Sequence, residues 1–187
     1  MPKTPARPLL LLDACCLINL LVTGRCEEIL THLAYRPATS RLIAEKEILS
    51  VSVSTASEGD RAREIISPAR LESSEKLVLL ELSGESALAD FIRFAAELDD
   101  GEASICALAM AQGASVATDD RKALRLLSRV APQIPTVQTP ELLYDWAHRS
   151  RAPEREIVTV LRAVRDRARF HPRRDAPRFD WWASFSS

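Results

Sequence analysis

The clearest hydrophobic pattern in the chain is a set of short apolar runs that stop at or near acidic residues. Residues 9–12 are four leucines that end at Asp13, and residues 114–118 are small, mostly apolar and followed by Asp119. Apolar runs without alternation are typical of strands buried on both faces of a parallel sheet. Residues 77–82 form another such run, and residues 135–138 are interpreted as a short last strand.

Segments with helical spacing lie between these runs. We expect helices over residues 14–21, 26–35, 42–49, 85–98, 100–112, 121–128, 141–148 and 153–169. Ser83 and Thr139 are candidate N-caps, Asp99 or Asp100 is another, and Gly113 is placed to end a helix in the left-handed conformation. Residues 53–76 are rich in Ser, Glu and Arg and are interpreted as a loop or a loosely held hairpin with helical pieces.

Strands that alternate with helices predict an α/β fold. We expect a three-layer α/β/α sandwich around a mainly parallel central sheet. The 187 residues are enough for one domain with a self-sufficient core. We place this domain at residues 1–148 and assign residues 149–187 to a basic helical extension whose tail carries Trp181 and Trp182. Because tryptophan is costly to leave in water, this tail is expected to dock on the domain, on a second copy or on a partner.

Charge is distributed unevenly along the chain. The formal net charge is only −1, but residues 1–120 carry a net −8 and residues 121–187 a net +7. The acidic part favours a cation site, and the basic part favours a polyanion or an acidic protein as partner. The four cysteines show no CxxC spacing and the three histidines form no helical pair, so we expect reduced thiols and no zinc site. No signal peptide or long apolar run is recognised, which predicts a cytoplasmic protein without a membrane span.

The acidic residues suggest the chemistry. Parallel strands bind ligands beyond their carboxyl ends, so Asp13 should meet Asp119 and Asp120 at one edge of the sheet. Glu102 lies at the start of the helix that precedes the strand ending near Asp119. Carboxylates crowded in this way repel one another, and Mg²⁺ or Mn²⁺ would relieve the repulsion while leaving room for phosphate oxygens. We therefore expect metal-dependent hydrolysis of phosphodiester bonds.

Two segments also resemble a known family. LLLDACCLINLL resembles the opening motif of PIN-domain proteins, and LDDGEASICALAMAQGASVATDDRKAL is similar to their later motif; the likeness covers residues 9–143. PIN domains are mostly Mg²⁺- or Mn²⁺-dependent ribonucleases, and many in bacteria and archaea are toxins held inactive by a cognate antitoxin. The resemblance therefore implies an endoribonuclease of a toxin-antitoxin pair, with RNA as substrate and an antitoxin protein as partner. It leaves a homodimer open.

Carried over residue by residue, the resemblance implies Asp13, Glu102 and Asp119 or Asp120 as metal-site carboxylates. Asn19 would orient the site, although a satisfied amide in the core is an equal interpretation. The family has a further acidic residue on a helix after the second element. Glu47 fits it better than Glu45, because an apolar residue follows Glu47.

Two departures from the family pattern stand out. Cys15 occupies a position where a small hydroxyl residue is common, and the extension after residue 149 is longer than in a minimal PIN domain. An aspartyl phosphotransferase of the haloacid-dehalogenase type would need an Asp at position 15, so we discount it. A non-catalytic PIN-like module that binds RNA or protein stays open as the alternative.

Overall fold

The computed structural model describes residues 7–46 and 68–185. Their strands form one sheet in the order β3-β2-β1-β4-β5, and every neighbouring pair is parallel. The strands are β1 (Leu9–Leu12), β2 (Arg36–Ser40), β3 (Val78–Leu80), β4 (Ser115–Ala117) and β5 (Thr136–Val137). The expected α/β fold with a parallel central sheet is therefore confirmed.

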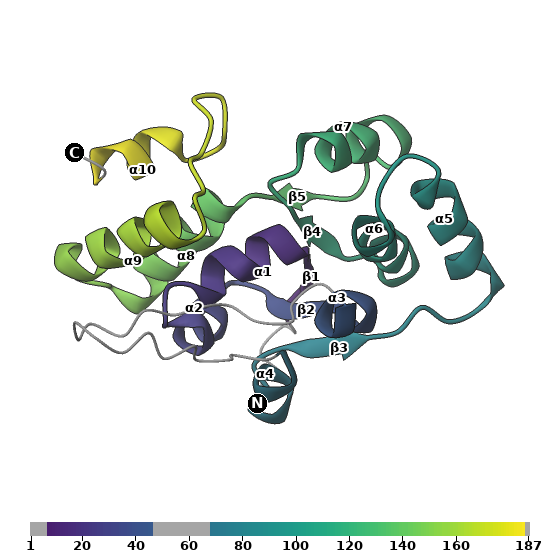
Figure 1. Ribbon diagram of the computed structural model, residues 1–187, viewed down its shortest axis with the longest axis horizontal. Coiled ribbons are helices and arrows are strands. Elements are labelled where there is room, and N and C mark those ends of the chain that lie inside the picture. The colour runs from purple at the N-terminus through teal and green to yellow at the C-terminus, as the bar shows by residue number, and fades with distance from the viewer. Residues whose placement is uncertain (1–6, 47–67, 186–187) are drawn as a thin grey trace, which may run out of the picture.

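Helices connect the strands and cover the sheet. They are α1 (Ala14–Leu21), α2 (Cys26–His32), α3 (Arg41–Lys46), α4 (Pro68–Ser73), α5 (Glu85–Ala95), α6 (Asp100–Gln112), α7 (Arg121–Val130), α8 (Thr139–Ser150), α9 (Glu154–Arg167) and α10 (Phe179–Ser184). In the view of Figure 1, α1, α2, α8 and α9 gather on one side of the strands, and α5, α6 and α7 lie on the other. Contacts of α2 with α8, and of α6 with α5, β1, β2 and β4, agree with this layered arrangement.

The centre of the core is β1, which lies between β2 and β4. Leu10, Leu11 and Leu12 are completely buried, as a strand with neighbours on both edges and helices on both faces requires. Because this strand is fixed so firmly, the residue that follows it has a well-defined position. That residue is Asp13.

The sequence analysis missed β2. A helix was expected over residues 26–35, whereas α2 ends at His32 and β2 begins at Arg36, with Pro37 as its second residue. The segment RPATS lacks large apolar side chains, so hydrophobic periodicity gave no signal for a buried strand. Thr39 is nevertheless fully buried, because its hydroxyl donates a hydrogen bond of 2.7 Å to the Leu12 carbonyl oxygen.

Two predicted helix caps are wrong. The N-cap of α5 is Gly84 rather than Ser83, and its φ of 86° is a conformation that glycine adopts without strain. The N-cap of α8 is Gln138 rather than Thr139, and it forms a reciprocal capping box with Glu141. The hydroxyl of Thr139 is therefore available for another contact, which is described below.

The C-terminal segment packs against the rest of the chain. The tail contains α10, a helix that periodicity did not reveal, and α10 contacts α8. Trp182 is only 4% exposed and packs edge-on against Phe170, with ring centroids 5.8 Å apart. The tail was expected to dock on the domain, on a second copy or on a partner, and the structure shows it packed on the domain of its own chain. Apolar residues of α9 such as Val160 join the same core, and the boundary at residue 149 stays a prediction.

Of the helices in the described ranges, none combines the length and the apolar character that crossing a bilayer demands. The loop predicted over residues 53–76 lies mostly outside the described residues, and its last part forms α4.

Candidate functional site

Asp13 anchors the site at the carboxyl end of β1. Its backbone N–H donates 2.9 Å to the Ala117 carbonyl, which joins the ends of β1 and β4. Its side chain is 4% exposed and caps α1, since Oδ1 accepts a hydrogen bond of 2.7 Å from Ala14 N. Oδ2 accepts from Thr118 Oγ1 at 2.8 Å and from Cys15 Sγ at 3.1 Å. Burial raises the pKa of Asp13, and these hydrogen bonds oppose the increase.

Asp119 lies beside Asp13 but is held by a different set of donors. Its Oδ1 accepts a hydrogen bond of 3.0 Å from Thr139 N. Its Oδ2 accepts from the Thr139 hydroxyl, from Asn19 Nδ2 at 3.1 Å and from Cys16 Sγ at 3.4 Å. Burial raises the pKa of Asp119, and the hydrogen bonds lower it. This carboxylate is fixed in orientation, and much of its accepting capacity is already used.

Asn19 accounts for part of that orientation. It is 4% exposed on α1, and its Nδ2 also donates to Thr139 Oγ1 at 3.0 Å. The two interpretations offered by the sequence are therefore compatible: Asn19 is a satisfied buried amide that also positions Asp119.

Asp120 faces the site from the start of α7. Its Oδ1 caps that helix by accepting from Lys122 N at 2.6 Å and Ala123 N at 2.9 Å. Its Oδ2 forms no hydrogen bond with any residue of the described ranges. Asp120 therefore keeps an oxygen for a ligand, unlike Asp119.

Glu102 completes the acidic cluster from the first turn of α6. The helix begins at Asp99, whose Oδ1 accepts from Glu102 N at 2.8 Å. Ser104 on the same turn donates 2.8 Å to Ser40 Oγ, which ties α6 to the end of β2. Half-buried, Glu102 has its pKa raised to about 7, first by burial and then by the negative charges of Asp99, Asp120 and Asp13.

The structure thus brings carboxylates from distant parts of the sequence to one edge of the sheet. The negative charges of Asp13 and Asp120 both act on Glu102, and Asp99 acts on both Asp13 and Glu102. No salt bridge between described residues involves any of these four. The oxygens of Asp13, Glu102 and Asp120 do not form a group of ligand atoms within 4.8 Å of one another; among the described residues, Cys15, Cys16 and Asp119 do.

Of the two remaining acidic candidates, Glu45 lies within the described residues and is separate from this cluster. Glu47 lies outside the described residues. Glu45 is exposed on α3, and its Oε1 lies 3.7 Å from Arg41 Nη1. The same guanidinium lies 2.6 Å from Glu81 Oε1 through its Nε, so Glu45 belongs to a surface ion-pair group.

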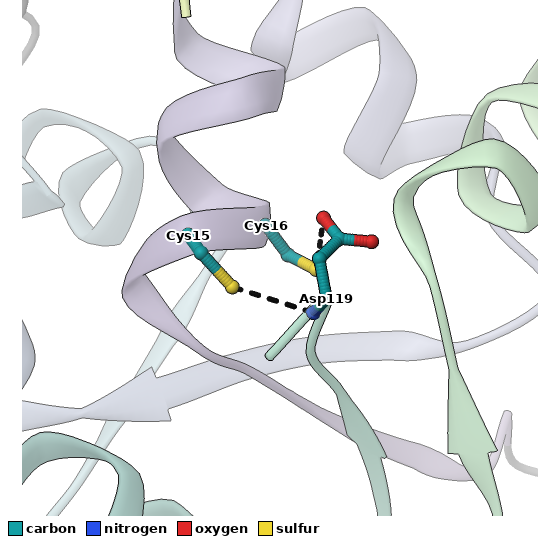
Figure 2. Close-up of side chains that lie close together, drawn as sticks. All are labelled: Cys15, Cys16 and Asp119. Carbon is teal, nitrogen blue, oxygen red and sulfur yellow. Dashed lines mark hydrogen bonds between the residues drawn. The ribbon is translucent and has the colours of Figure 1, made fainter. Parts of the chain in front are cut away.

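Two cysteines also enter the site, which the sequence analysis did not predict. Figure 2 shows Cys15 and Cys16 of α1 converging on Asp119. Cys15 Sγ lies 3.4 Å from Asp119 N, and Cys16 Sγ lies 3.4 Å from Asp119 Oδ2. One ligand atom from each of the three residues lies within 4.8 Å of the others, so the cluster has the composition and spacing to hold a metal ion. Cys15 is partly exposed, whereas Cys16 is completely buried.

Sequence reasoning also missed Thr118 and Thr139 as supports of the site. Thr118 holds Asp13, and Thr139 holds Asp119. The only available signal was a hydroxyl residue next to each predicted strand end, which is common in ordinary turns and caps.

Comparison with known proteins gave no relative. No protein-family model matches the chain, and no curated protein or solved structure matches it. The geometry of the site and the resemblance of its two motifs are therefore the basis for assigning a function.

Proposed function

We propose that this protein is a divalent-metal-dependent ribonuclease that hydrolyses RNA phosphodiester bonds. The observation that carries the proposal is the position of three acids at the same edge of the parallel sheet: Asp13 follows β1, Asp120 caps α7 after β4, and Glu102 lies in the first turn of α6, where the charges of the other two act on it. The resemblance of residues 9–143 to PIN domains supplies RNA as the substrate class and Mg²⁺ or Mn²⁺ as the ion. Three-layer parallel folds place ligands at this edge, so fold and motif agree.

Three carboxylates at this edge would offer oxygens to such an ion. Asp13 and Glu102 offer carboxylate oxygens, and Asp120 keeps one oxygen without a protein partner among the described residues. When bound, the ion would polarise the phosphodiester and provide an activated water. Hard divalent ions of this kind retain several waters, so three carboxylates are an adequate protein contribution.

The chain's own residues would perform the other tasks. Thr118 and Ala14 N hold the Asp13 carboxylate in one orientation, and the Asp99 cap fixes the turn that carries Glu102. Asp119 acts as a positioning residue, because its oxygens are held by Thr139, Asn19 and Cys16.

The basic C-terminal part supplies a surface for a polyanion. Arg155, Arg162 and Arg174 are exposed on or after α9. Arginines on one part of an otherwise acidic protein attract phosphates without reading a sequence. We assign RNA to this surface. A cognate antitoxin protein that masks the acidic edge follows from the resemblance to PIN-domain toxins, and this role is part of the proposal.

A cleavage assay tests the proposal. The purified full chain is incubated with end-labelled structured and single-stranded RNAs in Mg²⁺, Mn²⁺ or EDTA. We expect products that disappear in EDTA, and we expect both Asp13→Asn and Glu102→Gln to reduce the rate by at least about 100-fold, since loss of a metal ligand removes the charge stabilisation. Glu154→Gln, an exposed acid on α9, is the matched control and should cleave normally.

Each outcome has a definite meaning. Equal cleavage by wild type, Asp13→Asn and Glu102→Gln would refute the site. Binding of RNA without any product, in all three metal conditions, would replace the enzyme with the non-catalytic module.

A further inference from the structure

We propose that Cys15, Cys16 and Asp119 form a binding site for a thiophilic divalent cation of the Zn²⁺ class. This site is distinct in chemistry from the carboxylate site for a hard ion. The binding itself does not depend on the proposed ribonuclease activity.

The first argument is geometric. Adjacent residues in a helix point about 100° apart, so neighbouring cysteines do not usually share a ligand. Here the chain after β4 reaches the first turn of α1, where Cys15 Sγ contacts the backbone N of Asp119 and Cys16 Sγ contacts its carboxylate (Figure 2). The three ligand atoms lie within 4.8 Å of one another. Two sulfurs on a tetrahedral zinc lie about 3.8 Å apart at Zn–S distances of about 2.3 Å, so small side-chain movements would enclose the ion.

The second argument is the donor set. Asp13 Oδ2 lies 3.1 Å from Cys15 Sγ, which brings a fourth donor to the edge of the cluster. Two sulfurs and two carboxylate oxygens suit Zn²⁺ or Cd²⁺, whereas Mg²⁺ avoids sulfur ligands. Glu102 and Asp120, which face the same edge, offer oxygen alone. The thiols therefore select a softer ion than the carboxylates do.

The third argument concerns access and exchange. Cys15 is partly exposed, so an ion can approach from solvent. Each thiol now contacts a carboxylate through an S–H group, Cys15 to Asp13 and Cys16 to Asp119. On binding, each thiol releases its proton to water, and sulfur–metal–oxygen contacts replace the two S–H···O contacts. Thr139 and Asn19, which donate to Asp119 Oδ2, and Asp119 N, which donates to Cys15 Sγ, would have to share these atoms with the ion or shift away.

A functional consequence follows if the proposed function holds. The soft ion and the hard ion would share Asp13, so the two ions would exclude each other. Zn²⁺ would then inhibit cleavage by occupying the thiol site.

The test is a titration of the reduced, metal-free full chain with Cd²⁺, followed by ultraviolet sulfur-to-metal charge-transfer absorption. Wild type should show a saturating band at one Cd²⁺ per chain. Cys15→Ser keeps the size and the contact to Asp13, and it should lower the affinity by about 100-fold or more, because losing even an outer partner of a metal ligand costs 10–100-fold. Cys26→Ser, on α2 and outside the cluster, is the matched control and should titrate like wild type.

The outcomes separate the two proposals. Equal titration of wild type and Cys15→Ser, or complete displacement of Cd²⁺ by a 100-fold excess of Mg²⁺, would overturn the thiol site. Circular dichroism of each variant verifies that the fold is retained. The predicted inhibition by zinc is tested in the cleavage assay. Zn²⁺ should slow cleavage by wild type more than cleavage by Cys15→Ser, each relative to its own zinc-free rate. If no RNA is cleaved at all, the ribonuclease proposal fails while the Cd²⁺ result still decides the thiol site.

Discussion

Replacing Glu102 by glutamine should stabilise the metal-free protein at neutral and alkaline pH. Asp99, Asp120 and Asp13 repel the ionised Glu102, and burial removes part of its hydration. Glutamine has nearly the same shape and no charge, so the variant avoids both penalties. The exchange tests the acidic cluster by itself, without any assumption about the reaction.

The expected gain in stability follows from the pKa shift of Glu102. Folding raises the pKa of Glu102 from 4.5 to about 7. Each pKa unit corresponds to about 1.36 kcal/mol, so this shift corresponds to roughly 3 kcal/mol in the free energy of unfolding. Because Glu102 is only half-buried, solvent screening reduces the expected gain to about 1–2 kcal/mol.

The direction of the pKa shift determines how the stability of the protein depends on pH. A folded-state pKa above the unfolded one means that the native protein binds the proton more tightly, so wild-type stability declines as pH rises from 4.5 to about 7. The Glu102→Gln variant lacks this decline. The two proteins should therefore have similar free energies of unfolding at pH 4.5 and differ most at pH 8.

Urea denaturation in EDTA at these two pH values measures the difference, with Glu154→Gln as the exposed control. A Glu102→Gln variant that is no more stable than wild type at pH 8, or that shows the same difference at both pH values, would refute the repulsion between Glu102 and its acidic neighbours. Saturating Mg²⁺ should reverse the order, because a ligand that binds only the folded wild type stabilises it. This reversal depends on the proposed function, whereas the result in EDTA does not.

Two further substitutions test the supports of the site and of the C-terminal segment. Thr139→Val removes the hydroxyl that donates to Asp119 and should cost about 1–3 kcal/mol in the free energy of unfolding, whereas Thr139→Ser should restore most of it; equal stability of the two variants would show that the hydroxyl is dispensable. Trp182→Ala should cost about 3–5 kcal/mol because the side chain is 4% exposed, and the partly exposed Trp181→Ala should cost less. Thermal unfolding of both tryptophan variants measures this order, and a reversed order would contradict the docking of α10.

Local rules in the sequence determined much of the fold. The leucines of β1 and Gly113 at the end of α6 lie where the pattern predicted them, and of the two caps offered for α6 the structure has Asp99. These features depend on backbone preferences and on contacts within a few residues, which a single sequence displays. The parallel order then implied that Asp13 and Asp119 share an edge.

Only the tertiary structure determined how the site is assembled. Residues 36–40 form a central strand because Thr39 finds a buried carbonyl, a contact that no hydrophobic pattern records. Gln138 rather than Thr139 caps α8, and the Thr139 hydroxyl instead donates to Asp119, twenty residues earlier in the sequence. Nothing in the sequence distinguishes Cys15 and Cys16 from ordinary buried thiols, but the chain after β4 brings the backbone N of Asp119 to one and its carboxylate to the other. Each of these contacts joins residues that are far apart in the sequence, and the strength of such a contact depends on burial and distance, which exist only once the chain has folded.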